Sequence, residues 1–279
     1  MKVYPFKIPK PLHESLVYQV DHDIAFYDKL HQHEDIQLSF IVEGEGTLIV
    51  GDSINQYKKE DIVVIGSNLP HVFKSNLNYG KKSHMLTLFF AKDSFGNIFF
   101  ELEELKELKA FFKRAAHGFK VTTSKKALIT LFMQLENASK LSRFLILLEL
   151  LKKTSVCNYM SLSSFIYDKK YKEPEGKRMQ DVFDYTMTHS NNDISLETIS
   201  EVANMTKNAF CKYFKKRTNK TYFRFLNELR IEHACKLLIE EAEMGIADVA
   251  FRSGFKNLSN FNRQFKMIKK VNPSIFKKL

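Results

Sequence analysis

The chain has 279 residues, 44% of them hydrophobic, so it is long enough for two domains and apolar enough to bury their cores. It contains no run of about 18 apolar residues, so we expect no membrane-spanning helix. The N-terminal residues lack the apolar core of a signal peptide. The three cysteines lack metal-ligand spacing and suit a reducing compartment, so we expect a cytoplasmic protein.

The net charge of +11 is distributed unevenly. Residues 177–279 contain 19 Lys and Arg against 11 Asp and Glu, whereas residues 1–176 contain 24 against 21. Many proteins carry solvated lysine faces, so a basic excess alone is weak evidence for a particular partner. Together with the repeated motif described below, it favours nucleic acid as the partner.

The first predicted elements are strands. From about residue 24 to residue 90, short β-rich runs (IAFYD, IQLSFIVE, GTLIV, DIVVI and HMLTLFF) alternate with turn signals such as Gly44-Glu45-Gly46 and Gly66-Ser67-Asn68. This spacing predicts a small β-sandwich or barrel. From about residue 101 to residue 153 the apolar residues recur three and four apart, which predicts helices that bury one face.

Residues 168–178 (DKKYKEPEGKR) are polar and contain Pro174 and Gly176, so we predict a linker there. We expect an α+β chain in which residues 1–167 form one domain and residues 179–279 form a second, all-helical domain. The second domain is expected to consist of helices joined by short turns.

The second domain contains one helix-turn-helix pattern twice, and aligning Phe214 with Phe265 places the helices after the two turns at an offset of 51 residues. Such a motif packs two helices around a small residue, and its tight turn needs a residue that tolerates a positive φ. Ala250 and Gly254 suit these two roles in the second copy. Ser200 and Asn204 occupy the same places in the first, and Asn is well suited to left-handed backbone. Thr206 and Asn257 are good N-caps for the helices that follow.

The helix after each turn is amphipathic, with phenylalanines on its inner face and polar residues on its outer face. Arg and Asn side chains can hydrogen-bond bases with two prongs. We therefore predict base contacts on the outer faces, with a plain solvated surface as the alternative. The predicted residues are Lys207, Asn208, Cys211, Lys212, Leu258, Ser259, Asn262 and Arg263.

Basic residues follow both outer faces and are better placed for phosphates than for bases. They are Lys215, Lys216, Arg217, Lys266, Lys269 and Lys270. Between the copies, about 18 residues suit one helix of roughly 27 Å. Such a helix could hold two recognition helices about one DNA turn, near 34 Å, apart.

About 100 residues at the C-terminal end resemble the DNA-binding domain of the AraC/XylS family of bacterial transcription regulators. The resemblance is carried by Arg230-Ile231, Ala234, Leu237-Leu238, Ile246, Val249-Ala250, Gly254-Phe255, Phe261, Arg263, Phe265-Lys266 and Pro273-Ser274. Asn219 and Lys270 stand where the family usually has glycine. The resemblance implies a transcription regulator that binds double-stranded promoter DNA and contacts RNA polymerase. We expect it to be an activator.

The N-terminal stretch resembles the cupin-like effector domain common in that family, through His31, His33 and the run Asn68-Leu69-Pro70-His71. Metal-binding cupins have a glutamate ligand where this chain has Gln37, and Gln is a poor, neutral ligand. We therefore expect no metal. We predict that His31, His33, Gln37 and His71 line a pocket for a possible small-molecule effector. Hydrogen-bonding histidines without a ligand, and metal ligands of a cupin enzyme, are the alternatives.

Two further expectations follow from the resemblance. The segment Tyr4–Leu12 could be an arm that covers the pocket, or an ordinary extended terminus. The helices of residues 101–153 resemble the family's dimerisation region, so Leu145, Leu148 and Leu151 are candidate contacts of a homodimer, with the chain's own core as the alternative.

No nucleophile triad, paired catalytic carboxylates or Gly-rich phosphate loop is present, so we expect no catalytic residue and no cofactor. Two other functions stay open. One is a regulator that needs no effector and whose β domain only dimerises. The other is a metal-dependent cupin enzyme fused to a DNA-binding module.

Overall fold

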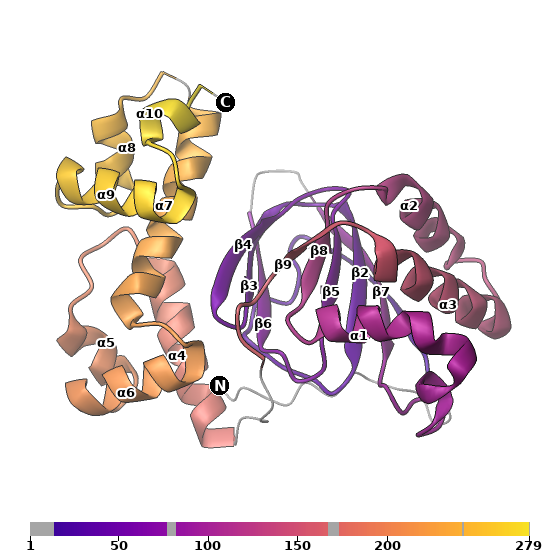
Figure 1. Cartoon of the computed structure of the whole chain (residues 1–279). Coiled ribbons are helices and arrows are strands. Elements are labelled where there is room, and N and C mark those ends of the chain that lie inside the picture. The colour runs from indigo at the N-terminus through magenta and orange to yellow at the C-terminus, as the bar shows by residue number, and fades with distance from the viewer. Residues whose placement is uncertain (1–13, 77–81, 167–172, 242, 279) are drawn as a thin grey trace. The chain divides into compact units, whose positions relative to one another are not determined.

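The computed structural model describes residues 14–76, 82–166, 173–241 and 243–278 (Figure 1). The chain divides into two compact units, residues 1–173 and 174–279. Within the described ranges, no helix combines the length and the apolar character needed to cross a membrane. The proposed arm, Tyr4–Leu12, lies outside the described residues.

The first unit contains two antiparallel sheets. The larger has the strand order β1-β7-β2-β5-β8-β9 and the smaller has the order β4-β3-β6. The strands are β1 (Val17–Asp23), β2 (Ile36–Glu43), β3 (Gly46–Val50), β4 (Ser53–Tyr57), β5 (Ile62–Ile65), β6 (His71–Ser75), β7 (Ser83–Phe90), β8 (Phe119–Val121) and β9 (Tyr159–Ser161).

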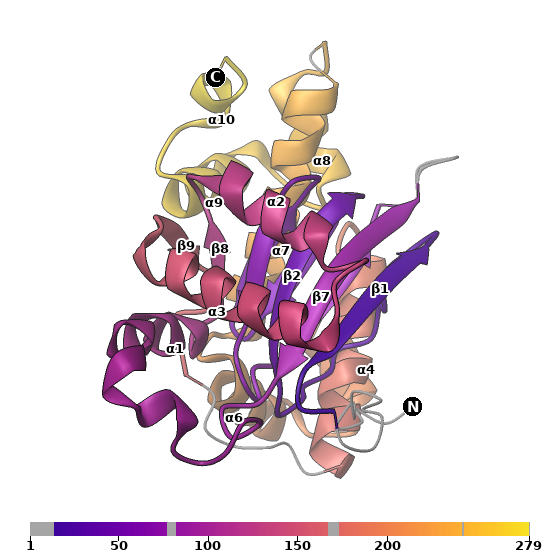
Figure 2. The ribbon, with the colours of Figure 1, turned by 90° about the vertical axis from the view of Figure 1, so that its right-hand side faces the viewer.

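The central strands are buried on both faces, which explains why β5 reads IVVI without alternation. On one face, Ile62 and Val64 pack into a core shared with helices α1 (Lys109–Ala115), α2 (Lys125–Gln134) and α3 (Lys140–Val156). On the other face, Val63 and Ile65 pack against residues of the smaller sheet. Figure 2 shows α2 and α3 lying across the larger sheet. Two 3-10 segments, Phe99–Glu101 and Glu103–Leu108, precede α1.

The predicted strand IAFYD is wrong. Residues 24–28 are irregular, because their backbone amides bond to side chains instead of to a neighbouring strand. The Ile24 amide donates to Asp23 Oδ1 and the Phe26 amide donates to Ser75 Oγ. The edge strand is instead β1, seven residues earlier, which pairs with β7 along its whole length.

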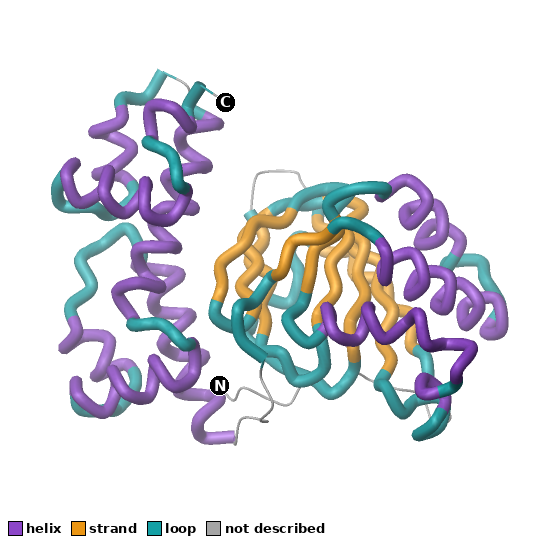
Figure 3. The backbone as a smooth tube through the Cα atoms, in the orientation of Figure 1, coloured by secondary structure: helices purple, strands orange, loops and turns teal. Residues whose placement is uncertain are grey.

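The described residues of the second unit form helices joined by turns and loops (Figure 3). Its helices are α4 (Glu173–His189), α5 (Leu196–Val202), α6 (Lys207–Thr218), α7 (Tyr222–Glu240), α8 (Ile246–Arg252), α9 (Leu258–Lys269) and α10 (Pro273–Phe276). The linker prediction is wrong for residues 173–178, which form the start of α4. A proline in the first turn of a helix costs no hydrogen bond, so Pro174 does not prevent this.

Two aromatic-centred cores flank α7. In the first, Phe210 and Phe214 of α6 pack against Phe183 of α4 and Tyr222 of α7. The second core joins Phe255, Phe261 and Phe265 to the C-terminal half of α7. Each half of the unit therefore has its own core, and α7 belongs to both.

Candidate nucleic-acid interface and histidine cluster

Both predicted motifs adopt the helix-turn-helix geometry. Asn204, between α5 and α6, has φ 50°, and Gly254, between α8 and α9, has φ 86°. The small residues predicted for the helix crossings, Ser200 and Ala250, are both buried. The left-handed turn is thus formed with Gly in one copy and with Asn in the other, as the sequence predicts.

The ends of the two recognition helices also match each other. Thr206 Oγ1 accepts from the Ala209 amide at the start of α6, and Asn257 Oδ1 accepts from the Asn260 amide at the start of α9. At the other ends, Asn219 and Lys270 have φ 55° and 65°. The two departures from glycine therefore leave the left-handed helix ends intact.

The predicted outer faces of α6 and α9 are exposed, while the phenylalanines on their inner faces are fully buried. The exposed residues include Asn208, Cys211 and Lys212 in α6 and Leu258, Ser259, Asn262 and Arg263 in α9. Because the inner face anchors each helix, the outer residues project from a fixed scaffold.

Two of these polar side chains have partners within the unit. Lys207 forms an ion pair with Glu197 of α5, and this hydrogen bond is the main cause that lowers the pKa of the Glu197 carboxyl. Arg263 Nη2 donates to Asn260 Oδ1 at 2.9 Å. Asn260 is a residue that the sequence prediction missed. It lies one helical turn before Arg263 and holds the Arg263 guanidinium.

The predicted phosphate contacts divide into two groups. Lys215, Lys216, Lys266 and Lys270 are exposed. Lys269, by contrast, donates to Glu232 Oε1 of α7 at 2.6 Å, and both side chains are mostly buried. That Lys269 binds phosphate stays a prediction, and in this structure its ammonium ties α9 to α7. The guanidinium of Arg217 lies 5.7 Å from the Tyr213 ring centre and is half-buried.

The structure brings His31, His33, Gln37 and His71 together in the first unit. His31 and His71 form an isolated β-bridge, and Gln37 lies in β2. All four side chains are buried. Each histidine offers one ring nitrogen to a common centre, and these three nitrogens lie within 4.8 Å of one another.

The hydrogen bonds of this cluster determine where the ring protons lie. Nδ1 of His31, His33 and His71 lies 2.7–2.9 Å from the backbone carbonyl oxygens of Lys29, Asp35 and Leu69 respectively. A carbonyl can only accept, so each Nδ1 carries the proton and the neutral ring presents an unprotonated Nε2. Burial, followed by the neighbouring histidines, lowers the pKa of His31 to about 4 and that of His71 well below its usual value.

Gln37 completes the cluster as an acceptor. Its Oε1 lies 3.3 Å from His33 Nε2 and 3.1 Å from His71 Nε2, while its Nε2 donates to Ser39 Oγ. Three acceptor atoms therefore face one another. Three facing acceptors are stabilised either by a bound cation or by rotation of the Gln37 amide, which would turn its NH2 group toward the rings.

The residues present fit a transition-metal ion. Imidazole nitrogens suit Zn, Cu, Fe and Ni, and carbonyl bonds to the opposite ring nitrogen are the usual support of a ligating histidine. Ligands at about 2.1 Å from a metal lie roughly 3.0–3.4 Å apart, so shifts of about 1 Å would bring the ring nitrogens within reach. Asp21, whose pKa is raised by burial, lines the cavity beside the cluster.

That cavity is small. It measures about 50 Å³, and Phe26, Phe73 and Phe89 are among its lining residues. Sites for drug-sized molecules are about 300–1,000 Å³, whereas one water occupies about 30 Å³ of liquid volume. The space beside the histidines therefore suits an ion with a water molecule better than a drug-sized organic molecule.

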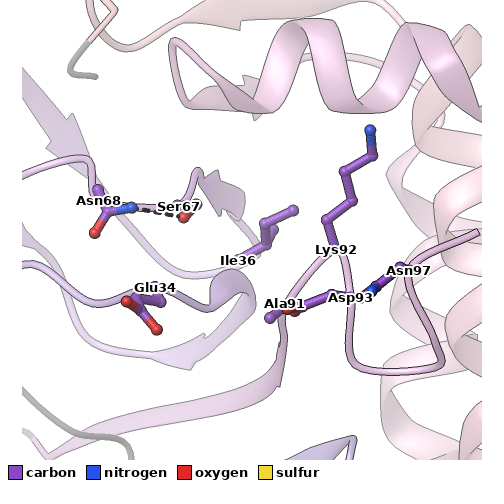
Figure 4. Close-up of a pocket in the computed structure, with 8 residues that line it drawn as sticks. All are labelled: Glu34, Ile36, Ser67, Asn68, Ala91, Lys92, Asp93 and Asn97. Carbon is purple, nitrogen blue, oxygen red and sulfur yellow. Dashed lines mark hydrogen bonds between the residues drawn. The ribbon is translucent and has the colours of Figure 1, made fainter. Parts of the chain in front are cut away.

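A larger cleft of about 390 Å³ lies near the same backbone segments (Figure 4). Glu34, Asn68, Asp93 and Asn97 are among its lining residues, and Asn68 donates to Ser67 within it. The Lys92 ammonium, which also lines it, is paired with Glu101 at 2.7 Å. The cleft is polar and open, with a volume in the range of small-molecule sites.

The three predicted dimer contacts differ in exposure. Leu151 is completely buried in the first unit's core, so the prediction for it is wrong. Leu148 is half-buried against the same core, whereas Leu145 is 56% exposed. Leu141, one turn earlier on the same face of α3, is 68% exposed and was missed.

Comparisons with known proteins agree with the second unit's geometry. A family model described as a helix-turn-helix domain matches residues 199–278. The chain is 28% identical over 102 residues to an uncharacterized HTH-type transcriptional regulator, YdeC, from Bacillus subtilis, covering 37% of this chain and 35% of that protein. An uncharacterized HTH-type transcriptional regulator from Staphylococcus aureus is 32% identical over 100 residues, covering 36% and 13%. The chain thus spans about a third or less of the curated relatives it matches.

Two solved structures are similar at lower identity. The DNA-binding domain of AdpA, solved in complex with a target DNA, is 21% identical, covers 35% of this chain and 87% of its own, and gives a TM-score of 0.34. ToxT from Vibrio cholerae O395 is 16% identical, covers 95% of this chain and 97% of its own, and gives a TM-score of 0.36.

Proposed function

Because the C-terminal unit is an AraC-type helix-turn-helix DNA-binding domain, we propose that the chain is a sequence-specific DNA-binding transcription regulator. In this proposal α6 and α9 each enter a major groove, so that one protomer reads two successive segments of duplex DNA. The 19-residue helix α7 spans roughly 28 Å, which suits two segments about one DNA turn apart.

One observation carries this proposal: the same left-handed turn and the same exposed helix face occur twice in one unit. Asn204 and Gly254 form equivalent turns, and each is followed by a helix with buried phenylalanines and an exposed polar face. A structural helix pair has no need of two such faces. Side chains at the start of a recognition helix are the ones that reach base edges.

Selection of binding sites from random duplex DNA by the purified full chain tests the proposal. We expect an enriched sequence whose affinity exceeds that of a scrambled duplex by at least about a thousandfold at physiological salt. Equal affinity for the selected and scrambled duplexes would contradict sequence-specific reading. Equal affinity that also falls steeply with salt would leave only phosphate contacts.

Contrary to the expectation of no metal from the sequence, we further propose that the effector of this regulator is a transition-metal ion held by His31, His33 and His71, with the Gln37 oxygen as a weaker fourth ligand. The three convergent acceptor nitrogens and the small volume of the adjacent cavity, about 50 Å³, favour an ion over an organic molecule at this position. Bound there, the ion would supply positive charge that draws the ring nitrogens and the Gln37 oxygen together.

Metal analysis of the full chain, purified without a polyhistidine tag and without chelators, tests this second proposal. We expect about one ion per chain, lost in His71→Ala and retained in His117→Ala, a matched histidine outside the cluster. The metal-free protein should bind its selected DNA with a different affinity from the loaded protein. Stoichiometric metal without any effect on DNA affinity would instead favour a metal-dependent enzyme fused to a DNA-binding module.

The oligomeric and regulatory parts of the proposal rest on the first unit. The exposed pair Leu141 and Leu145 on α3 supports a homodimer through this helix. Activation through contact with RNA polymerase extends the resemblance described above. A dimeric mass in solution that becomes monomeric in Leu145→Glu would support the interface, and an unchanged dimer would exclude it.

A further inference from the structure

Arg230 lies near the middle of α7 and contacts both helix-turn-helix motifs. Its Nε donates to the Ser190 carbonyl and its Nη2 donates to the Asn192 carbonyl, both at 2.7 Å. These carbonyls belong to the turn that leads from α4 into α5, the first helix of the first motif. The guanidinium also lies 5.9 Å from the ring centre of Phe255, which follows the turn of the second motif.

The turn of the second motif is closely packed against this guanidinium. A Cβ placed on Gly254 would lie 2.8 Å from Arg230 Nε, 2.8 Å from the Ser190 carbonyl oxygen and 2.9 Å from Asn191 Cα. Only a residue without a side chain permits this approach. The turn between α8 and α9 therefore packs against both the turn before α5 and the Arg230 side chain.

Two further contacts surround this junction. Lys256, just after the turn of the second motif, pairs at 2.6 Å with Asp193, which lies in the turn between α4 and α5. His233, one turn after Arg230 on α7, bonds through Nδ1 to Asn191 Oδ1 at 3.0 Å. The Lys256 and Asp193 side chains are largely exposed, so their ion pair contributes little to stability. The hydrogen bonds of the partly buried Arg230 therefore supply most of the stabilising contact between the two turns.

A single helix fixes the distance between two motifs better than their relative rotation, because long helices bend and the second motif could pivot on its end. A second contact between the motifs removes this freedom. We propose that Arg230 is a positioning residue that sets the orientation of α9 relative to α6, and thereby the spacing between the two DNA segments. The inference rests on the proposed function but concerns only how the two segments are registered.

The test compares two duplexes for each protein: the selected site, and the same site with one base pair inserted between its two segments. The insertion moves the second segment by 3.4 Å and rotates it by roughly 35°. We expect the wild-type chain to lose roughly tenfold or more in affinity on the insertion, a loss of the size of a mismatched base pair. Arg230→Met keeps the side-chain stem but removes both donors. The inserted base pair should therefore lower the affinity of this variant only about twofold to threefold.

Arg224→Met is the matched control, because Arg224 is an exposed arginine on the same helix that pairs only locally with Glu228. It should retain the wild-type ratio between the two duplexes. Arg230→Lys keeps the positive charge but has one donor nitrogen in place of two, so it should lie between the wild-type chain and Arg230→Met. It serves as the variant if Arg230→Met does not fold. The binding ratio is the decisive readout, since a purely structural role would weaken both duplexes equally.

The outcomes separate the two proposals. If the wild-type chain selects no sequence at all, the proposed function fails. If it selects a two-segment site but Arg230→Met and Arg230→Lys keep the full penalty for the inserted base pair, the positioning role of Arg230 is refuted while the proposed function stands. A wild-type chain that is indifferent to the insertion would refute a fixed spacing in the same way.

Discussion

Replacing Gly254 by alanine should destabilise the second helix-turn-helix motif far more than the equivalent change in the first. At Gly254 two costs add. A left-handed φ of 86° costs an alanine about 1–2 kcal/mol. The new Cβ would lie 2.8 Å from two heavy atoms, and overpacking of this kind costs about 1–3 kcal/mol. We therefore expect a total of about 2–5 kcal/mol.

Asn204→Ala is the matched change in the first motif. Asn204 has φ 50° but is exposed, so only the backbone cost applies, and about 1 kcal/mol is expected. For a domain near 100 residues, about 1 kcal/mol lowers the melting temperature by roughly 4 °C or more. The Gly254→Ala chain should therefore melt at least about 8 °C below the wild-type chain, and Asn204→Ala about 4 °C below.

The chain contains no tryptophan, and both units contain helices, so neither fluorescence nor circular dichroism isolates this motif. Native-state hydrogen exchange, read by mass spectrometry on peptides of α8 and α9, gives the local free energy of opening. Peptides from α1 to α3 serve as the internal reference. Equal destabilisation by the two alanines would refute the argument that the junction with Arg230 and Ser190 leaves no room for a Cβ.

The remaining predictions concern DNA contacts and thiol chemistry. Arg263→Ala should cost about 1–3 kcal/mol on the selected site and relax base preference at one position, measured by fluorescence anisotropy; equal weakening on every sequence would contradict base reading. Lys216→Ala should weaken all duplexes alike and reduce the salt slope by about one. Cys211 is exposed on α6, so bound DNA should slow its alkylation, and undiminished alkylation would place α6 outside the interface. Burial raises the pKa of Cys235 to about 12, so this thiol should stay unmodified between pH 7 and 9 in the folded chain and react once it is unfolded.

The second unit could be predicted closely from the sequence because its signals are local. A left-handed turn, an N-cap and a helical period each depend on a few neighbouring residues, and Asn204 and Thr206 act as their residue types predict. What the sequence could not provide was the pairing of charges across elements. Lys269 was predicted to contact phosphate from its position after the recognition face, at the end of α9, but Glu232, 37 residues earlier on α7, holds its ammonium.

The first unit was less predictable because its contacts are distant in sequence. Apolar residues of α3 occur all around the helix, so periodicity alone could not separate the buried Leu151 from the exposed Leu145. The histidines were identified through the resemblance to a cupin-like domain, and His71 approaches Gln37 across 34 residues. The carbonyl bonds that direct their unprotonated nitrogens inward depend on backbone geometry, which the sequence does not reveal.

The central claim is that one protomer reads two DNA segments, one through α6 and the other through α9. Site selection should therefore be repeated with Lys212→Ala and with Arg263→Ala, and the enriched sequences compared with those of the wild-type chain. The account predicts two sequence blocks about 10 base pairs apart. Lys212→Ala should relax the base preference in only one block, and Arg263→Ala in only the other. A single block, or two variants that blur the same block, would contradict it.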